Sequence, residues 1–181
     1  MKSSSLTLAT LVACVTTLAH AQATPFGLRE GMSLTDLAAV AGPLSPQEGT
    51  PPTFYVTRVP RPHPDLTVYA VVVGDSTGLC QVVGGKAIDS SSVAEIEANR
   101  VYQTLKEQLT AKYGVASSTG KVQARWLSIS DAAIPGNLDA ISLSLVPQPS
   151  GAILVQLRYR FMNVHRCQVP APPPDPIRDA L

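Results

Sequence analysis

The most regular hydrophobic pattern of the chain lies between residues 92 and 113. Ser92 and Glu95 have the spacing of a capping box, and Gly114 follows as a helix stop. The apolar positions recur at intervals that place them on one helical face: Val93, Ile96, Val101, Leu105, Leu109 and Tyr113. This pattern predicts a long amphipathic helix that lies across a sheet and leaves its charged faces in solvent.

A shorter helix is predicted directly after residue 33. Ser33 is an N-cap candidate with Asp36 three residues later, and Gly42-Pro43 ends the pattern. Leu34, Leu37, Ala38 and Ala41 have helical spacing between these limits. The segment therefore predicts about two and a half helical turns, with residues 45–52 as the loop that follows.

Alternation of apolar and polar side chains predicts six strands. Three precede the long helix and three follow it, at residues 53–59, 66–73, 78–83, 121–130, 140–147 and 152–164. Only Gly74 to Thr77 separate the second strand from the third, which predicts a hairpin. The order of elements is that of an α+β protein. We expect a single domain with an antiparallel sheet of about six strands and two helices packed on one face.

Residues 1–21 have the features of a signal peptide. Lys2 supplies a positive charge, residues 6–18 are mostly apolar, and Ala19-His20-Ala21 is a small-x-small cleavage site. Cleavage there would leave one α+β domain over residues 22–167 and a proline-rich tail over residues 168–181, which we expect to be disordered or extended.

An alternative cleavage site lies inside the same segment. Residues 11–14 also fit a bacterial lipoprotein box, which would make Cys14 the lipidated first residue of a membrane-anchored envelope lipoprotein. Either interpretation predicts an exported protein, periplasmic or secreted in the first case and lipid-anchored in the second. The mature chain has no further apolar run long enough for a transmembrane span.

The charge of the chain argues against a nucleic-acid partner, and its cysteine and histidine content predicts a disulfide and no metal site. The 14 basic and 13 acidic residues nearly cancel, and no clustered basic surface of the kind that binds nucleic acid is visible. Removal of the signal peptide would take Cys14 with it, so that Cys80 and Cys167 predict one disulfide in an exported protein. Because the mature chain has no C-x-x-C motif and only two histidines, we expect no metal site and no cofactor.

A G-x-S-x-G pattern at residues 74–78 suggests a nucleophile. Ser76, Asp131 or Asp139, and His165 follow the order serine, acid, histidine of the α/β-hydrolases. In that fold the motif joins a strand to a helix, whereas the residues after Gly78 predict a strand. A hairpin tip explains the same residues, so a small serine hydrolase is kept as the alternative.

The last predicted strand offers candidate binding residues. Arg158 and Arg160 alternate with Tyr159, which places two cations on one strand face, suited to an anionic partner. Together with Trp126 they form our candidate binding set for an unidentified protein or small ligand.

Residues 26–43, FGLREGMSLTDLAAVAGP, resemble the helix opening of the outer-membrane assembly lipoproteins and of domains like the β-lactamase-inhibitor protein. That pattern is G-M-(S/T)-x-x-(D/E)-(L/V) followed by G-x-P. This chain departs from it afterwards, because a proline-rich segment and a strand stand where those domains have a second helix. PHPDLTVYAVVV, GLCQVVG and LKEQLTAKYG resemble a family of exported bacterial α+β proteins with no assigned activity. The resemblance implies a non-enzymatic role in binding or envelope housekeeping.

Overall fold

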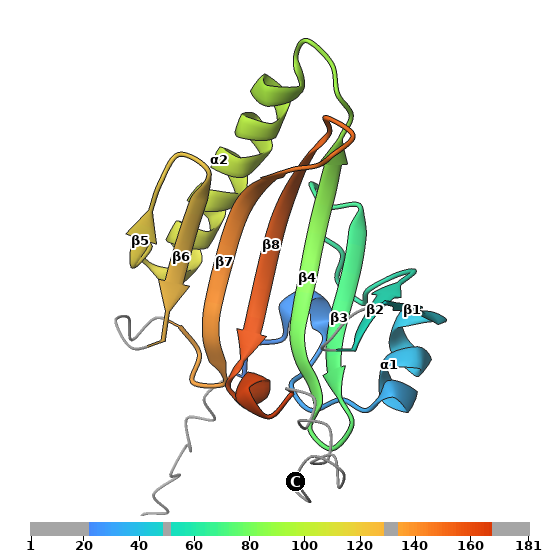
Figure 1. The fold of residues 1–181 in the computed structure, drawn as a ribbon. Coiled ribbons are helices and arrows are strands. Elements are labelled where there is room, and N and C mark those ends of the chain that lie inside the picture. Colours follow the sequence, from blue (N-terminus) through green and yellow to red (C-terminus); the bar gives the residue numbers. More distant parts are fainter. Residues whose placement is uncertain (1–21, 49–51, 129–133, 168–181) are drawn as a thin grey trace, which may run out of the picture.

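The computed structural model describes residues 22–48, 52–128 and 134–167, which form an eight-stranded antiparallel sheet with two α-helices (Figure 1). The strand order is β1-β2-β3-β4-β8-β7-β6-β5. The bounds are η1 (Pro25–Gly27), α1 (Leu34–Ala41), β1 (Leu44–Gln47), β2 (Thr53–Val56), β3 (Val68–Gly74), β4 (Gly78–Ile88), α2 (Ala94–Tyr113), β5 (Ser118–Thr119), β6 (Gln123–Leu127), β7 (Leu138–Pro147), β8 (Ile153–Phe161) and η2 (Met162–Arg166). The predicted α+β class and the antiparallel sheet are confirmed.

The sheet has eight strands where about six were expected, and the two additional strands are its edges. β1 lies in the segment that was predicted as a loop, contains Pro46, and is mostly exposed. β5 is two residues long and fully exposed. Edge strands of this kind are held by backbone pairing with one neighbour and bury little, so their sequences carry no alternation that would reveal them.

The hydrophobic core lies between α2 and one face of the sheet, which we call the covered face. α2 crosses this face at β7, β8 and β4. The buried side chains alternate along the strands and follow one stripe of the helix: Val101, Leu105, Leu109, Leu143, Val155, Leu157 and Phe161. Leu37 and Ala41 of α1 belong to the same core. α1 thus adds to the hydrophobic cluster and contacts the edge strand β1.

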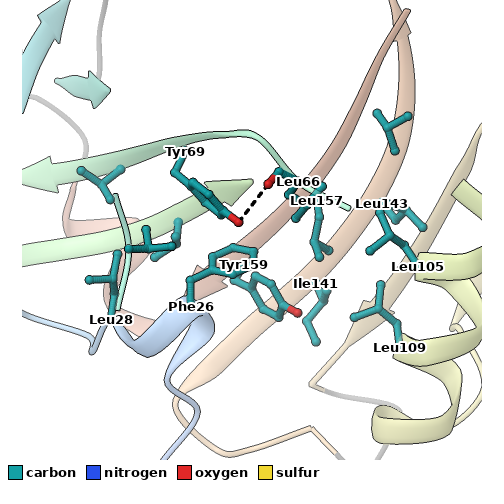
Figure 2. Close-up of a cluster of buried hydrophobic side chains, with 14 of the residues drawn as sticks. Phe26, Leu28, Leu66, Tyr69, Leu105, Leu109, Ile141, Leu143, Leu157 and Tyr159 are labelled. Carbon is teal, nitrogen blue, oxygen red and sulfur yellow. Dashed lines mark hydrogen bonds between the residues drawn. The ribbon is translucent and has the colours of Figure 1, made fainter. Parts of the chain in front are cut away.

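Aromatic rings extend this core toward the N-terminal segment (Figure 2). The ring of Phe26 meets Tyr69 and Tyr159 edge to face, with centroid distances of 5.0 and 5.7 Å. β4 continues through Gly84, whereas the sequence predicted a strand that ends at residue 83. A Cβ atom on Gly84 would lie 2.9 Å from Cζ of Phe26 and 2.7 Å from Cδ1 of Leu66. Because Gly84 has no side chain, the Phe26 ring can pack against β4 at this position.

The predicted cap of α1 is confirmed. The Ser33 hydroxyl accepts a hydrogen bond from the Asp36 backbone N–H at 3.1 Å, and the Asp36 carboxylate accepts one from the Ser33 N–H at 3.1 Å. The Ser33 hydroxyl also donates to the Asp36 carboxylate at 2.7 Å, and this bond, followed by the one from the Ser33 N–H, holds the pKa of Asp36 below its ordinary value. Gly42 ends the helix with a positive φ of 78°.

The predicted N-cap of α2 is wrong by one residue. The helix begins at Ala94, and Ser92 makes no capping hydrogen bond because Val93 occupies the N-cap position. Val93 and Ile96 are 57% and 71% exposed, and the small residues Ala94 and Ala98 are buried in their place. At the N-terminal end of α2, the buried face of the helix is therefore shifted by about one residue from the predicted face. Contact with the sheet selected this rotation, which the periodicity alone leaves open.

Glu97 joins the polar side of α2 to the sheet. Its carboxylate lies 3.2 Å from Nζ of Lys86 on β4 and 2.8 Å from Nη2 of Arg100 one turn along the helix. The hydrogen bonds from Arg100 and then from Lys86 lower the pKa of Glu97 to about 2.

We expect Glu97→Gln to destabilise the protein in a pH-dependent way. The pKa of Glu97 is lower in the folded protein than in the unfolded chain, so its stabilisation is fully present above about pH 4.5 and is lost as the pH falls toward 2. Urea denaturation from pH 7 to pH 2 should show the wild-type advantage over Glu97→Gln shrinking across this window. Glu107→Gln is the matched control, since Glu107 is exposed on the same helix and forms no ion pair within the described residues. A gap between wild type and Glu97→Gln that stays constant with pH would contradict the prediction.

Candidate ligand-binding groove

The sheet face opposite α2 carries the second set of alternating side chains, and we call it the open face. Of the described helices, only η2 reaches it, at the end where β8 finishes. Exposed side chains on this face include Tyr55 and Val68, which are 50% and 43% exposed. A large sheet surface is therefore available to a ligand within the described part of the chain.

Cross-strand pairing groups particular side chains on the open face. Arg158 on β8 lies opposite Val83 on β4, and Arg160 lies opposite Gln81. The same line of paired residues continues across the sheet. Val83 lies opposite Ala70 on β3, and Ala70 lies opposite Tyr55 on β2. Residues that are far apart in the sequence thus line one strip across four strands.

Two hollows of about 450 and 290 Å³ follow this strip, and we call them together the open-face groove. They share Val72, Gln81 and Arg158. The larger one extends along β4 over an aliphatic lining that includes Val68, Ala70, Val83, Ala87 and Leu154. The smaller one is bounded by η2 through Val164, His165 and Cys167. Within the described part of the chain, no aspartate or glutamate lines either hollow.

Arg158 lies where the two hollows meet, and its charge is not balanced by an acidic partner within the described residues. Its Nη2 donates one hydrogen bond, to the Gln156 amide oxygen at 3.0 Å, and its buried Nε–H has no hydrogen-bond partner among the residues that the structure describes. Burial lowers the pKa of Arg158, and the nearby charge of Arg160 adds to this effect. A half-buried guanidinium without an acidic partner among the described residues is suited to receive an anion.

Arg160 on the same strand face differs in having an acidic partner, although its buried Nε–H is also without a hydrogen-bond partner among the described residues. Its Nη2 forms an ion pair with the Asp139 carboxylate at 2.8 Å. Asp139 lies at the irregularity where β7 pairs with the end of β8. The pair leaves Arg158 as the cation of the groove that an external anion would neutralise.

The predicted Cys80–Cys167 disulfide is confirmed, and it holds the end wall of the groove. Its Cα atoms are 6.3 Å apart, and it joins the start of β4 to the end of η2. Asn163 adds to this attachment because its side-chain amide donates to the backbone oxygens of Thr77 and Leu79, both at 3.1 Å. These links hold η2 against the β3–β4 hairpin beside Arg160.

The Ser76 candidate lies at the exposed tip of that hairpin. Gly74 pairs with Gly78 across the turn, and β4 follows directly. The strand-to-helix turn of a nucleophile elbow is not formed here, so no helix N-terminus stands behind Ser76 to stabilise an oxyanion. His165 is exposed in η2, and no hydrogen bond joins it to Ser76 in the part of the chain described. Asp131 lies outside the described residues, and Asp139 is paired with Arg160.

The candidate binding residues divide between the two faces of the sheet. Arg158 and Arg160 lie on the open face, whereas Trp126 and Tyr159 are buried on the covered face, 0% and 8% exposed. The Trp126 indole N–H donates to the Gly114 carbonyl oxygen at 2.9 Å. Burial raises the pKa of Tyr159 well above its ordinary range. The structure therefore gives Trp126 and Tyr159 positions in the core.

The described residues contain no group of three potential metal-ligating side chains. His63 and His165 line different hollows, and the imidazole of His63 lies 2.8 Å from the Gln108 amide oxygen. None of the helices in residues 22–48, 52–128 and 134–167 has the length and apolar character of a membrane span.

Gln81, Gln156 and the aliphatic lining of the groove were not among the sequence candidates. Alternation within β4 and β8 places Gln81 and Gln156 on the face opposite the core, and this signal was available. Their neighbours are decided by strand register, which joins β4 to a strand about 75 residues later in the chain.

No protein-family model matches this chain, and no curated protein or solved structure shows significant similarity to it.

Proposed function

We propose that this chain is an exported, non-enzymatic binding protein that holds an amphipathic anionic ligand in the open-face groove. The observation that carries the proposal is Arg158, a half-buried cation without an acidic partner within the described residues, set beside an aliphatic hollow. A buried charge is stabilised when it is paired and hydrogen-bonded, so a bound anion would relieve an unfavourable state of the empty protein.

The shape of the site supports binding of a ligand along the sheet. The hollow of about 450 Å³ has the size of a small-molecule site and combines an apolar lining with a few polar groups. The sheet edges are poorly suited to receive another strand, because β1 contains Pro46 and β5 has only two residues.

Export is part of the same proposal. The signal-like residues 1–21 and a disulfide that closes a long loop fit an oxidising compartment, periplasmic or extracellular. The resemblance of residues 26–43 to exported envelope domains points the same way. Anchoring through Cys14 would place the same groove at a membrane surface.

Arg158→Gln is expected to weaken binding of an anionic amphipathic probe. We would titrate the purified, disulfide-bonded protein with the fluorophore 8-anilinonaphthalene-1-sulfonate. Loss of a charge-assisted hydrogen bond should raise the Kd of the probe by about 10- to 100-fold. Arg158→Lys should give an intermediate Kd, because it keeps the charge but loses the planar fork.

Arg125→Gln is the matched control for this experiment. Arg125 lies on the open face of β6, paired with Ser142, and does not line the groove. Circular dichroism would verify that each variant is folded. Equal probe affinities for wild type and Arg158→Gln would refute the proposal, as would an equal loss in Arg125→Gln.

A further inference from the structure

We propose that the ligand of the open-face groove is a straight-chain alkyl carboxylate of about ten carbons, with its carboxylate on Arg158 and its chain along β4 toward Ala87 and Leu154. This inference rests on the proposed binding function and adds the chemical class, the orientation and the length of the ligand. Four features of the groove carry it.

The charge of the groove matches a head group with a single negative charge. Arg160 is neutralised by Asp139 at 2.8 Å, which leaves Arg158 as the uncompensated cation of the lining. The guanidinium presents parallel N–H donors that match the two oxygens of a carboxylate. Gln156 holds one side of this guanidinium through its amide oxygen at 3.0 Å, which restricts the orientation of the fork.

The lining beyond Arg158 matches an uncharged apolar body. Gly85, Ala87 and Leu154 continue the groove away from the guanidinium, and among the described residues no other charged side chain lines the larger hollow. Val68 and Ala70 form the opposite wall. A second charged group on the ligand would lie on this aliphatic surface without a partner, which is unfavourable.

The length of the ligand follows from the strand geometry. Arg158 and Leu154 are four residues apart on β8 and lie opposite Val83 and Ala87 on β4. Four residues of strand span about 13 Å, the length of an extended chain of about ten carbons. The floor of the groove twists with the sheet, and a flexible chain can follow such a surface along its whole length.

The first test is displacement of 8-anilinonaphthalene-1-sulfonate by alkyl compounds of graded length. Hexanoate, octanoate and decanoate should displace the probe with affinities that rise about two- to fourfold per added methylene. The gain should stop near ten carbons, so that tetradecanoate binds no better than decanoate. Decylamine has the same chain with the opposite charge, and it should fail to displace the probe.

The second test determines in which direction the alkyl chain of the ligand lies in the groove. Ala87 is exposed, so Ala87→Trp fills the apolar end of the groove without entering the core. We expect this variant to bind hexanoate as wild type does and to lose at least tenfold in decanoate affinity. Gln123→Trp places the same ring at an exposed position on β6, outside the groove, and should leave the chain-length profile unchanged.

The outcomes separate this inference from the proposed function. If the probe binds through Arg158 but decanoate does not displace it, the binding function stands and the alkyl carboxylate class is refuted. If decylamine displaces the probe as well as decanoate does, or if Ala87→Trp keeps the wild-type profile, the class or the orientation is wrong. If the probe does not bind through Arg158, both proposals fail.

Discussion

Replacing Cys80 and Cys167 with serine is expected to lower the free energy of unfolding by about 4 to 5 kcal/mol. The disulfide joins residues separated by 87 positions in the sequence, so its loss releases a long loop in the unfolded chain and raises the entropy of that state. Because a domain of this size has a total stability of about 5 to 15 kcal/mol, the variant should be marginally stable.

Urea denaturation of wild type and Cys80→Ser/Cys167→Ser, each with and without reductant, measures this effect. Reductant should lower the midpoint of the wild type toward that of the variant and leave the variant unchanged, which is the internal control. A wild-type midpoint that is insensitive to complete reduction would show that the bridge contributes little to stability.

Truncation of Trp126 is expected to have an effect of similar size. Trp126→Ala should lower the free energy of unfolding by about 3 to 5 kcal/mol, because it removes a fully buried ring from the hydrophobic core. Trp126→Phe keeps much of the ring volume but leaves the Gly114 carbonyl oxygen without its donor, which should cost about 1 to 3 kcal/mol.

The same variants separate a core role for Trp126 from a binding role. In Trp126→Phe, the folded protein should bind 8-anilinonaphthalene-1-sulfonate with wild-type affinity, because Trp126 lies on the covered face and Arg158 on the open one. Thermal unfolding followed by circular dichroism gives the stability, and the probe titration gives the affinity. A stable Trp126→Phe protein with weakened probe binding would contradict the assignment of Trp126 to the core.

Several elements could be predicted from the sequence because their signals are local. Ser33, Asp36 and Gly42 define α1 within one short segment, and the observed helix has these ends. Alternation in β8 correctly separated Arg158 and Arg160 from the buried positions. Local alternation predicts which residues share a strand face, but it does not predict which residues of other segments lie beside that face.

Other elements were decided by contacts between distant segments. Trp126 and Tyr159 were chosen as binding candidates for their chemistry, yet both occupy the covered face of the sheet. The groove required the pairing of β8 with β4 to bring Arg158 beside Gln81 and Val83. A shift of that register by one residue would exchange the faces, and nothing within either strand alone specifies the partner residue.

The sequence by itself determined the two helices, the six principal strands, the hairpin at Gly74 to Gly78 and the pairing of the two cysteines in the domain. These follow from periodicity, capping and composition, which act within a few residues or depend on the type of residue. Only the tertiary structure decided the two edge strands, the rotation of α2, the passage of β4 through Gly84 and the groove around Arg158. The physical reason is that strand register and helix rotation are set by packing between segments far apart in the chain.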